Sequence, residues 1–157
     1  IVSMSTHISH EHLPEYIWTS FLDLLEYIQK HGAELVGTPF ISYLNLDDTG
    51  QPKDELLDVE IGFPIDKEIP STEKFQSYVL PGYQAVRTLY VGDYDDLTAS
   101  YKELIDAIKQ ENGIFTFRSY EYFLTDASVP LEDQETMIEL TYRLKRKDLF
   151  TEWSHQH

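Results

Sequence analysis

The chain has 157 residues, of which 41% are hydrophobic, so it is long enough to bury a core and is most simply one domain. Its formal net charge is −16, and it contains no cysteine. Such an acidic chain repels nucleic-acid phosphates, and without cysteine it has no disulfides, thiolate metal sites or cysteine nucleophiles. Because it also lacks a stretch of 18 apolar residues and a signal-peptide pattern, we expect a soluble, cytoplasmic protein that contacts neither DNA nor membranes directly.

The first half of the chain predicts a strand, a helix and a hairpin. The expected elements are a strand at 1–8, a helix at 14–31, and strands at 40–46 and 56–65. Pro14 suits the first turn of the helix, and Gly32 suits its C-terminal end. In the last strand the odd-numbered residues from Leu57 to Ile65 are apolar, so they are expected to face the core.

The second half predicts the same order of elements. These are a strand at 75–90 interrupted at Leu80-Pro81-Gly82, a helix at 97–110, and strands at 117–124 and 136–145, followed by a polar tail at 147–157. The helix is expected to end at Asn112-Gly113.

The two halves match each other at a nearly constant offset. Phe21, Leu24, Leu25 and Ile28 correspond to Tyr101, Leu104, Ile105 and Ile108, about 80 residues later, and 59–65 corresponds to 138–144. We therefore expect a single domain, 1–146, built from pseudo-repeats at 1–66 and 75–146. Because hairpin strands pair antiparallel, the predicted class is α+β, with duplicated strand-helix-strand-strand units forming one antiparallel sheet and two long helices on one face. Pockets tend to form where two such units meet.

Glu121 is the most unusual residue in the predicted strands, because it lies among aromatic residues on both faces. A carboxylate removed from water needs hydrogen-bond donors or a cation. Glu121 is therefore a candidate anchor for a cationic ligand, or a general acid or base. The alternative is an ordinary solvent-facing glutamate on a half-buried sheet.

Aromatic residues make up 13% of the chain, with 11 tyrosines, and they suit pockets for flat or cationic ligands. The candidates that we expect to line a site with Glu121 are Tyr43, Tyr94, Tyr101, Tyr142, Trp18 and Phe123. Glu60 and Glu139 are equivalent in the duplication. They either join Glu121 as a carboxylate pair for hydrolysis or are outward-facing strand residues.

No metal site or cofactor is expected. His7, His10 and His12 lack an acidic partner at the spacing of a known metal motif. The sequence also has no nucleophile elbow, no phosphate-binding glycine loop and no dinucleotide fingerprint.

Several short segments together resemble the GyrI-like family, the effector-binding domain also found at the C-terminus of multidrug-sensing and AraC-type bacterial regulators. They are LPGYQA at 80–85, YVGDYDDL at 90–97, YEYFLTD at 120–126, ETMIEL at 135–140 and VEIGFPI at 59–65. The resemblance implies a duplicated fold, an aromatic groove at the pseudo-twofold axis and a buried glutamate that pairs with lipophilic cations. Glu121 occupies the matching position.

Three functions remain open on the sequence. The first is a standalone protein, without a helix-turn-helix region, that is expected to bind an amphipathic, cationic small molecule. The second is a hydrolase of reactive electrophiles of the cyclopropanoid type, with Glu121 acting on water or a leaving group and Tyr43 or Tyr142 assisting. The third is a module that binds a basic protein partner, either DNA gyrase or a separate regulator, through the acidic surface.

Overall fold

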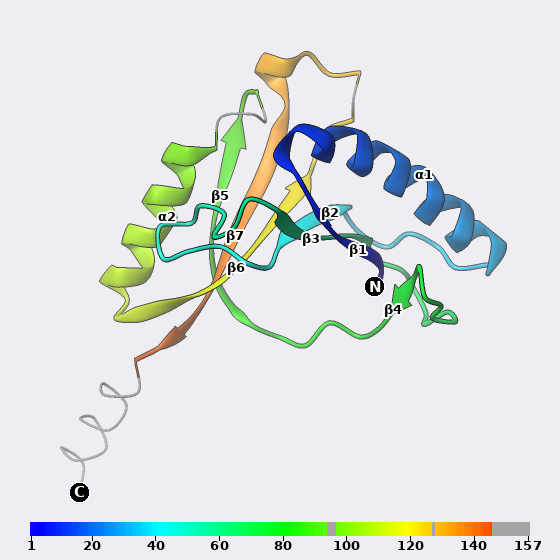
Figure 1. Ribbon diagram of the computed structural model, residues 1–157, viewed down its shortest axis with the longest axis horizontal. Coiled ribbons are helices and arrows are strands. Elements are labelled where there is room, and N and C mark those ends of the chain that lie inside the picture. Colours follow the sequence, from blue (N-terminus) through cyan, green and yellow to red (C-terminus); the bar gives the residue numbers. More distant parts are fainter. Residues whose placement is uncertain (94–96, 127, 146–157) are drawn as a thin grey trace, which may run out of the picture.

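In the computed structural model, which describes residues 1–93, 97–126 and 128–145, one sheet carries two long helices (Figure 1). The first half contains β1 (Val2–Ile8), the 3-10 helix η1 (His10–His12), α1 (Leu13–Lys30), β2 (Phe40–Tyr43) and β3 (Leu57–Phe63). The second contains β4 (Gln76–Ser77), β5 (Gln84–Val91), α2 (Thr98–Gln110), β6 (Gly113–Phe123), η2 (Leu131–Asp133) and β7 (Glu135–Leu144). The predicted order, strand-helix-strand-strand twice, is confirmed, and the break at Leu80-Pro81-Gly82 separates β4 from β5.

The helix ends follow the expected local chemistry. Pro14 lies in the first turn of α1, where its missing N–H costs no hydrogen bond. Gly32 follows the helix with φ +68°, a conformation that glycine adopts without a steric penalty. Asn112 ends α2 in the same way with φ +54°, and β6 begins at the next residue.

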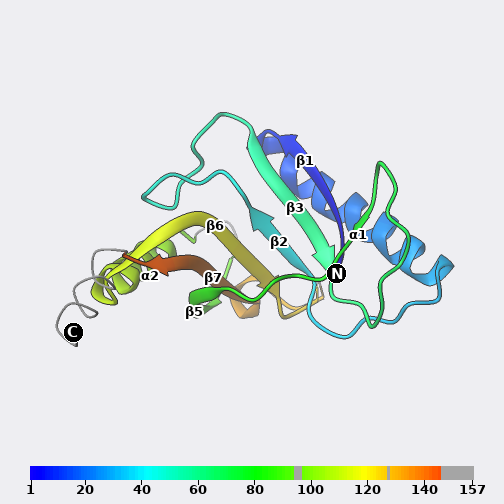
Figure 2. The ribbon, with the colours of Figure 1, turned by 90° about the horizontal axis from the view of Figure 1, so that it is seen from below.

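The sheet has seven strands in the order β4-β1-β3-β2-β6-β7-β5, and all the pairs are antiparallel. The two halves join where β2 pairs with β6, and they extend in opposite directions from that seam (Figure 2). The register at the seam is symmetric, because Phe40 pairs with Tyr122 and Ser42 with Tyr120, while Ile41 pairs with Glu121. Glu121 therefore lies at the centre of the seam, directly opposite the residue that the 80-residue offset makes its equivalent.

Both helices cover the same face of the sheet, as predicted. α1 packs on β1 and β3, and α2 packs on β5, β6 and β7. Each helix buries its own apolar cluster, with Leu24 and Ile28 from α1 and Leu104 and Ile108 from α2. Burying such an aliphatic side chain contributes about 1.5–3 kcal/mol, so each half has a core of its own.

β6 contains an irregularity that the sequence does not predict. Phe115 pairs with Tyr142 and Ser119 with Leu140, so three residues of β6 lie opposite a single residue of β7. Phe117, within this bulge, has φ +66° and is 46% exposed. A bulge bends a strand and changes the direction of the side chains that follow it, and this one comes just before Ser119 and Glu121.

The face of the sheet opposite the helices is more polar. Glu60, on β3, accepts hydrogen bonds from Ser3 (2.7 Å) and Tyr78, and pairs with Arg118 (2.7 Å). The Arg118 guanidinium also lies 4.8 Å from the centre of the Tyr120 ring. Glu60 therefore does not join Glu121, because it lies on the face that is turned away from it. Although it faces outward from the helices, it is 6% exposed and bound to Arg118.

Glu139 is on that same face of β7, opposite Tyr120 of β6, so it does not join Glu121 either. It accepts a hydrogen bond of 2.7 Å from Tyr83. The two equivalent glutamates are built into the sheet face away from the helices.

None of the helices in the described residues is long and apolar enough to span a membrane.

Candidate ligand-binding site

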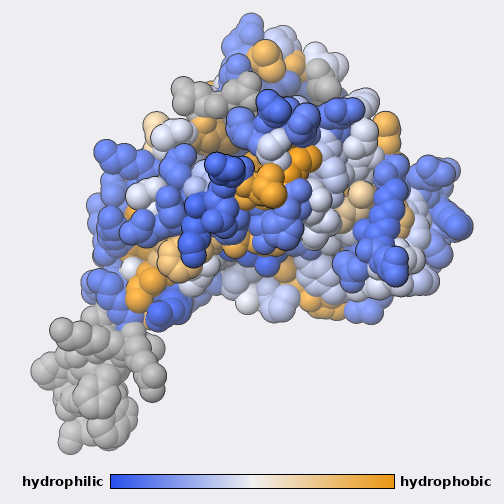
Figure 3. Space-filling model, in the orientation of Figure 1, coloured by the Kyte–Doolittle hydropathy of each residue, from blue (hydrophilic) through white to orange (hydrophobic). Residues whose placement is uncertain are grey.

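A cavity of about 550 Å³ opens between the two helices on the helix-covered face of the sheet. Its walls come from η1 and the start of α1, from β2 and the loop that follows it, from the start of α2, and from β6 and the start of β7. Apolar residues gather near the middle of this side of the molecule, below the first turns of α1 (Figure 3). The volume is within the range of pockets that enclose drug-sized ligands.

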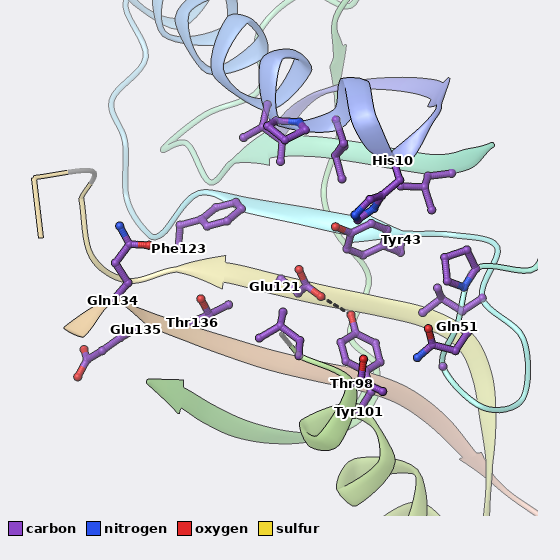
Figure 4. Close-up of a pocket in the computed structure, with 18 of the residues that line it drawn as sticks. His10, Tyr43, Gln51, Thr98, Tyr101, Glu121, Phe123, Gln134, Glu135 and Thr136 are labelled. Atoms are coloured by element: carbon purple, nitrogen blue, oxygen red, sulfur yellow. Dashed lines mark hydrogen bonds between the residues drawn. The ribbon is translucent and has the colours of Figure 1, made fainter. Parts of the chain in front are cut away.

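Glu121 lies at the floor of the cavity, near the C-terminal end of β6 (Figure 4). It is 3% exposed, and the neighbouring strand presents Ile41 beside it. The Tyr101 hydroxyl, which reaches Glu121 from α2, donates a hydrogen bond to its carboxylate. The same hydroxyl oxygen lies 2.8 Å from the Ser119 hydroxyl, so Ser119 is placed to donate to Tyr101 while Tyr101 donates to Glu121.

The surroundings of Tyr101 keep its hydroxyl protonated. Burial raises its pKa well above the ordinary value, and the negative charge of Glu121 and the hydrogen bond to it add to that rise. The phenol therefore stays a hydrogen-bond donor at physiological pH. Tyr101 and Glu121 form a buried donor and acceptor pair at the base of an accessible cavity.

The loop between β2 and β3 fixes one wall of the cavity. The Asp47 carboxylate accepts hydrogen bonds from the backbone N–H groups of Thr49 (2.9 Å) and Gln51 (3.0 Å), which holds the turn together. Gly50 has φ +82°, and a Cβ at this position would lie 2.9 Å from a ring carbon of Tyr101. The loop therefore packs closely against Tyr101, and only glycine fits there without displacement.

Negative charge at the base of the cavity comes from Glu121. Among the described lining residues, Glu121 and Glu135 carry carboxylates, His10 is the one side chain that can become positive, and none is lysine or arginine. In Figure 4 the Glu135 side chain points away from the centre of the cavity, and His10 is at the opposite edge, near Tyr43. An amphipathic ligand with a positive group matches this distribution of charge.

The structure brings together four of the seven predicted site residues. Glu121, Tyr43, Tyr101 and Phe123 line the cavity. Trp18 does not, because it lies on the outer side of α1 and is 60% exposed. Tyr142 is also outside the lining, because it packs against the apolar cluster under α2. Tyr94 falls outside the described residues, as does the predicted tail at 147–157.

Other lining residues were not predicted as ligand contacts. They add polar atoms to the walls and include His10, Gln51, Thr98, Thr125, Gln134 and Thr136. Most lie at the ends of elements or in loops, where no hydrophobic periodicity marks them. Thr98 begins α2, and Thr125 lies two residues after the end of β6.

The histidines do not form a metal site in the part of the chain that the structure describes. No group of three or more His, Asp or Glu side chains there is arranged to hold a metal ion. His7 lies 3.7 Å from Asp58 and His12 lies 3.3 Å from Glu11, while His10 lies at the cavity edge.

Comparisons with solved structures identify relatives of the fold. EcmrR in its complex with DNA has a TM-score of 0.70 and 17% identity, covering 92% of this chain and 53% of that one. The isolated C-terminal domain of EcmrR has a TM-score of 0.65 and 18% identity, covering 92% and 90%. A hydrolase from Listeria innocua has a TM-score of 0.57 and 10% identity, covering 90% and 86%.

At these identities the similarity demonstrates the fold alone. The chain spans about half the length of EcmrR in the DNA complex. No curated protein sequence matches the chain. The sequence profile of the GyrI-like small molecule binding domain matches residues 5–145, which is most of the chain. The protein therefore belongs to the GyrI-like small molecule binding domain family.

Proposed function

We propose that the protein binds a lipophilic, cationic small molecule in the cavity between its helices, with Glu121 as the anchor for the positive group. The observation that carries this proposal is a glutamate that is 3% exposed at the floor of a cavity of about 550 Å³. A carboxylate in a low-dielectric site attracts a cation more strongly than one in water does. Tyr43, Tyr101 and Phe123 supply aromatic surface to the same ligand.

The family supports the class of ligand but does not specify it. A GyrI-like small-molecule binding domain accounts for a cavity of drug-like size in a chain of 157 residues. The C-terminal domain of EcmrR has the same fold, so we further propose that this domain acts as an effector sensor, alone or beside a DNA-binding partner. Because the net charge is −16, we expect a separate partner protein, and not this chain, to contact the DNA phosphates.

Hydrolysis in the same cavity is the second candidate. The hydrogen bond between Tyr101 and Glu121 provides a carboxylate and a phenol next to each other, which are the groups needed for general base and general acid steps. The structural neighbour from Listeria innocua that is described as a hydrolase supports this candidate. In this alternative, Glu121 activates water against a reactive electrophile of the cyclopropanoid type.

The experiment is a thermal-shift titration of the parent protein and Glu121→Gln with lipophilic quaternary ammonium and phosphonium ions. We expect the cations to raise the Tm of the parent and to lose most of that effect in the variant, because glutamine has the same size without the charge. Tyr142→Phe is the matched control, since Tyr142 lies outside the cavity. Equal stabilisation of the parent and Glu121→Gln would contradict the anchor role.

Turnover distinguishes the two candidates. Incubation of the parent protein with a panel of electrophilic cyclopropanes, followed by chromatography, measures hydrolysis directly. Binding without product formation supports the sensor, whereas product formation that Glu121→Gln abolishes supports the hydrolase.

A further inference from the structure

The outer side of α1 carries a row of exposed apolar side chains away from the cavity. Trp18, Leu22 and Leu25 are 60%, 52% and 40% exposed. Their spacing of four and three residues places them next to one another along one side of the helix. We call these three residues the α1 stripe. Single exposed apolar residues are common, but a contiguous group on one helix is typical of an interaction surface.

The fold itself does not require this stripe, as the second helix demonstrates. α2 packs on the same face of the sheet and matches α1 at the 80-residue offset. At the positions equivalent to Trp18 and Leu22, α2 has Thr98 and Lys102, and both are exposed. The equivalent of Leu25 is Ile105, which is buried. Thr98 lines the cavity, so the comparison depends on Lys102, which is a charged residue at the position where α1 has Leu22. A helix in this position therefore tolerates a charged residue there.

The charges beside the stripe indicate what kind of surface would cover it. Glu15 is one turn before Trp18, and Glu26 is one turn after Leu22, and both are exposed. Asp23, also on α1, is bound to Lys74 at 2.9 Å. A second copy of this chain, with its net charge of −16, would bring like charges together, and an anionic lipid surface would do the same. A positively charged partner gains attraction at the same contacts.

We propose that the α1 stripe docks an amphipathic helix of a basic partner protein. The apolar face of that helix covers Trp18, Leu22 and Leu25, and lysine or arginine residues beside its apolar face reach Glu15 and Glu26. This is the arrangement in which one helix presents anchors at positions i, i+3, i+4 and i+7 to an apolar surface. Trp18 is the expected main anchor, because tryptophan is enriched among the residues that dominate interface energetics.

The test uses the full chain with Trp153→Phe, so that tryptophan emission reports on Trp18 alone. The probe is a synthetic helical peptide of about 20 residues, with leucine at positions i, i+3, i+4 and i+7 and lysine on both sides of that face. A twin peptide has glutamate in place of each lysine. We expect the basic peptide to bind and shift the Trp18 emission to shorter wavelength, with an affinity that falls as salt increases. The acidic twin should not bind.

Leu22→Lys introduces the residue that α2 has at the equivalent position, so the fold is expected to tolerate it. We expect this variant to weaken peptide binding about tenfold or more. The matched control, Lys102→Ala on α2, should leave binding unchanged. Glu15→Gln combined with Glu26→Gln should reduce both the affinity and its salt dependence, which separates the charge contribution from the apolar one.

Four results would overturn the proposal. One is no binding of the basic peptide at low salt, and another is equal binding of the two peptides. The third is a concentration-dependent dimer in sedimentation that Leu22→Lys abolishes, which would assign the stripe to a second copy. Binding to anionic lipid vesicles by the parent but not by Leu22→Lys would likewise contradict it.

Discussion

Glu60 and Glu121 are both buried in the middle of the sheet, on opposite faces, and their surroundings differ. Glu60 is bound to Arg118 and accepts hydrogen bonds from Ser3 and Tyr78, so the chain itself supplies its cation. Glu121 faces a cavity of ligand size and accepts a hydrogen bond from Tyr101. The first arrangement holds two halves of a sheet together, and the second leaves a carboxylate within reach of a ligand.

The internal repeat sharpens the same contrast. Ile41 and Glu121 are equivalent in the two halves and pair with each other across the seam. In the first half this position is apolar and belongs to the cluster that includes Phe21, whose equivalent in the second half is Tyr101. The second half therefore replaces an apolar pair with a phenol and a carboxylate. Because the first half folds without these polar groups, we infer that stability of the fold does not explain them.

High pH should produce the largest change, because it affects phenols on both faces at once. Burial is the main cause that raises the pKa of Tyr101 on the helix face and those of Tyr78 and Tyr83 on the other face. On that other face burial also raises the pKa of Tyr120, to about 12. The unfolded chain loses these protons near pH 10, so the stability from the raised pKa is present below pH 10 and lost above it.

Tyr101 should contribute about 1.4 kcal/mol per pH unit, and the other three less, because water screens their partly exposed rings. Urea unfolding between pH 8 and pH 11, with tyrosinate absorbance recorded in parallel, measures this loss. We expect the buried phenols to ionise only as the protein unfolds. Complete ionisation near pH 10 in a folded protein would contradict the burial described here.

Arg118→Ala should have the largest effect among the substitutions. It leaves Glu60 buried without its cation, which typically costs 3–5 kcal/mol in a fully enclosed site. Because the Arg118 side chain is 33% exposed, we expect a loss of about 2–3 kcal/mol in the free energy of unfolding, measured in urea. Arg87→Ala is the control, since its pair with Glu139 is 3.9 Å long and Arg87 is 69% exposed, and it should cost less than about 1 kcal/mol. Equal losses of unfolding free energy in the two variants would contradict the structural role of the pair between Arg118 and Glu60.

Tyr101→Phe should have a smaller effect on stability. It removes the donor to Glu121 and leaves the ring in place, and we expect a loss of about 1–2 kcal/mol in the free energy of unfolding. Tyr142→Phe keeps a ring that packs against the cluster under α2 and should change stability by less than about 0.5 kcal/mol. If Tyr101→Phe is as stable as the parent, the hydrogen bond at the base of the cavity does not contribute to the fold.

Tyr43→Leu should have the smallest effect, and it should appear in ligand affinity. The substitution removes an aromatic wall of the cavity, and we expect about a fivefold loss of affinity for a quaternary ammonium ligand, measured by calorimetry. Tyr122→Leu removes an aromatic ring from the other face of the sheet, so its affinity should equal that of the parent. If Tyr122→Leu loses more affinity than Tyr43→Leu, the ligand binds on the face of the sheet away from the helices, which would contradict the proposed site.

The repeated pattern was enough to predict the fold class, because the 3.6-residue spacing of each helix and the alternation in β3 record the core side directly. Glu121 was singled out from the sequence because it is a carboxylate among aromatic residues in a predicted strand. Tyr101 and Phe123 were selected with it because they are aromatic, and both line the cavity. Their neighbours in the cavity, such as Gln51 and Thr136, do not, because loop and strand-end residues carry no periodic signal.

The burial of Glu60 was missed for a different physical reason. Strict alternation in β3 indicates a half-buried strand with one solvated face, but both faces of this strand are covered. The second face is closed by contacts distant in sequence, such as those of Ser3 and Tyr78. Trp18 was expected in the cavity from its residue type alone, and its position on the helix turns it outward.

The most direct test is a calorimetric cycle with benzyltrimethylammonium and its neutral carbon isostere, neopentylbenzene, on the parent protein and Glu121→Gln. The two ligands have nearly the same shape, so their difference in affinity isolates the charge. We predict that the parent prefers the cation by about tenfold or more, and that the preference largely disappears in Glu121→Gln while the neutral ligand binds both proteins alike. The same preference in both proteins would contradict the claim that Glu121 anchors a cationic ligand.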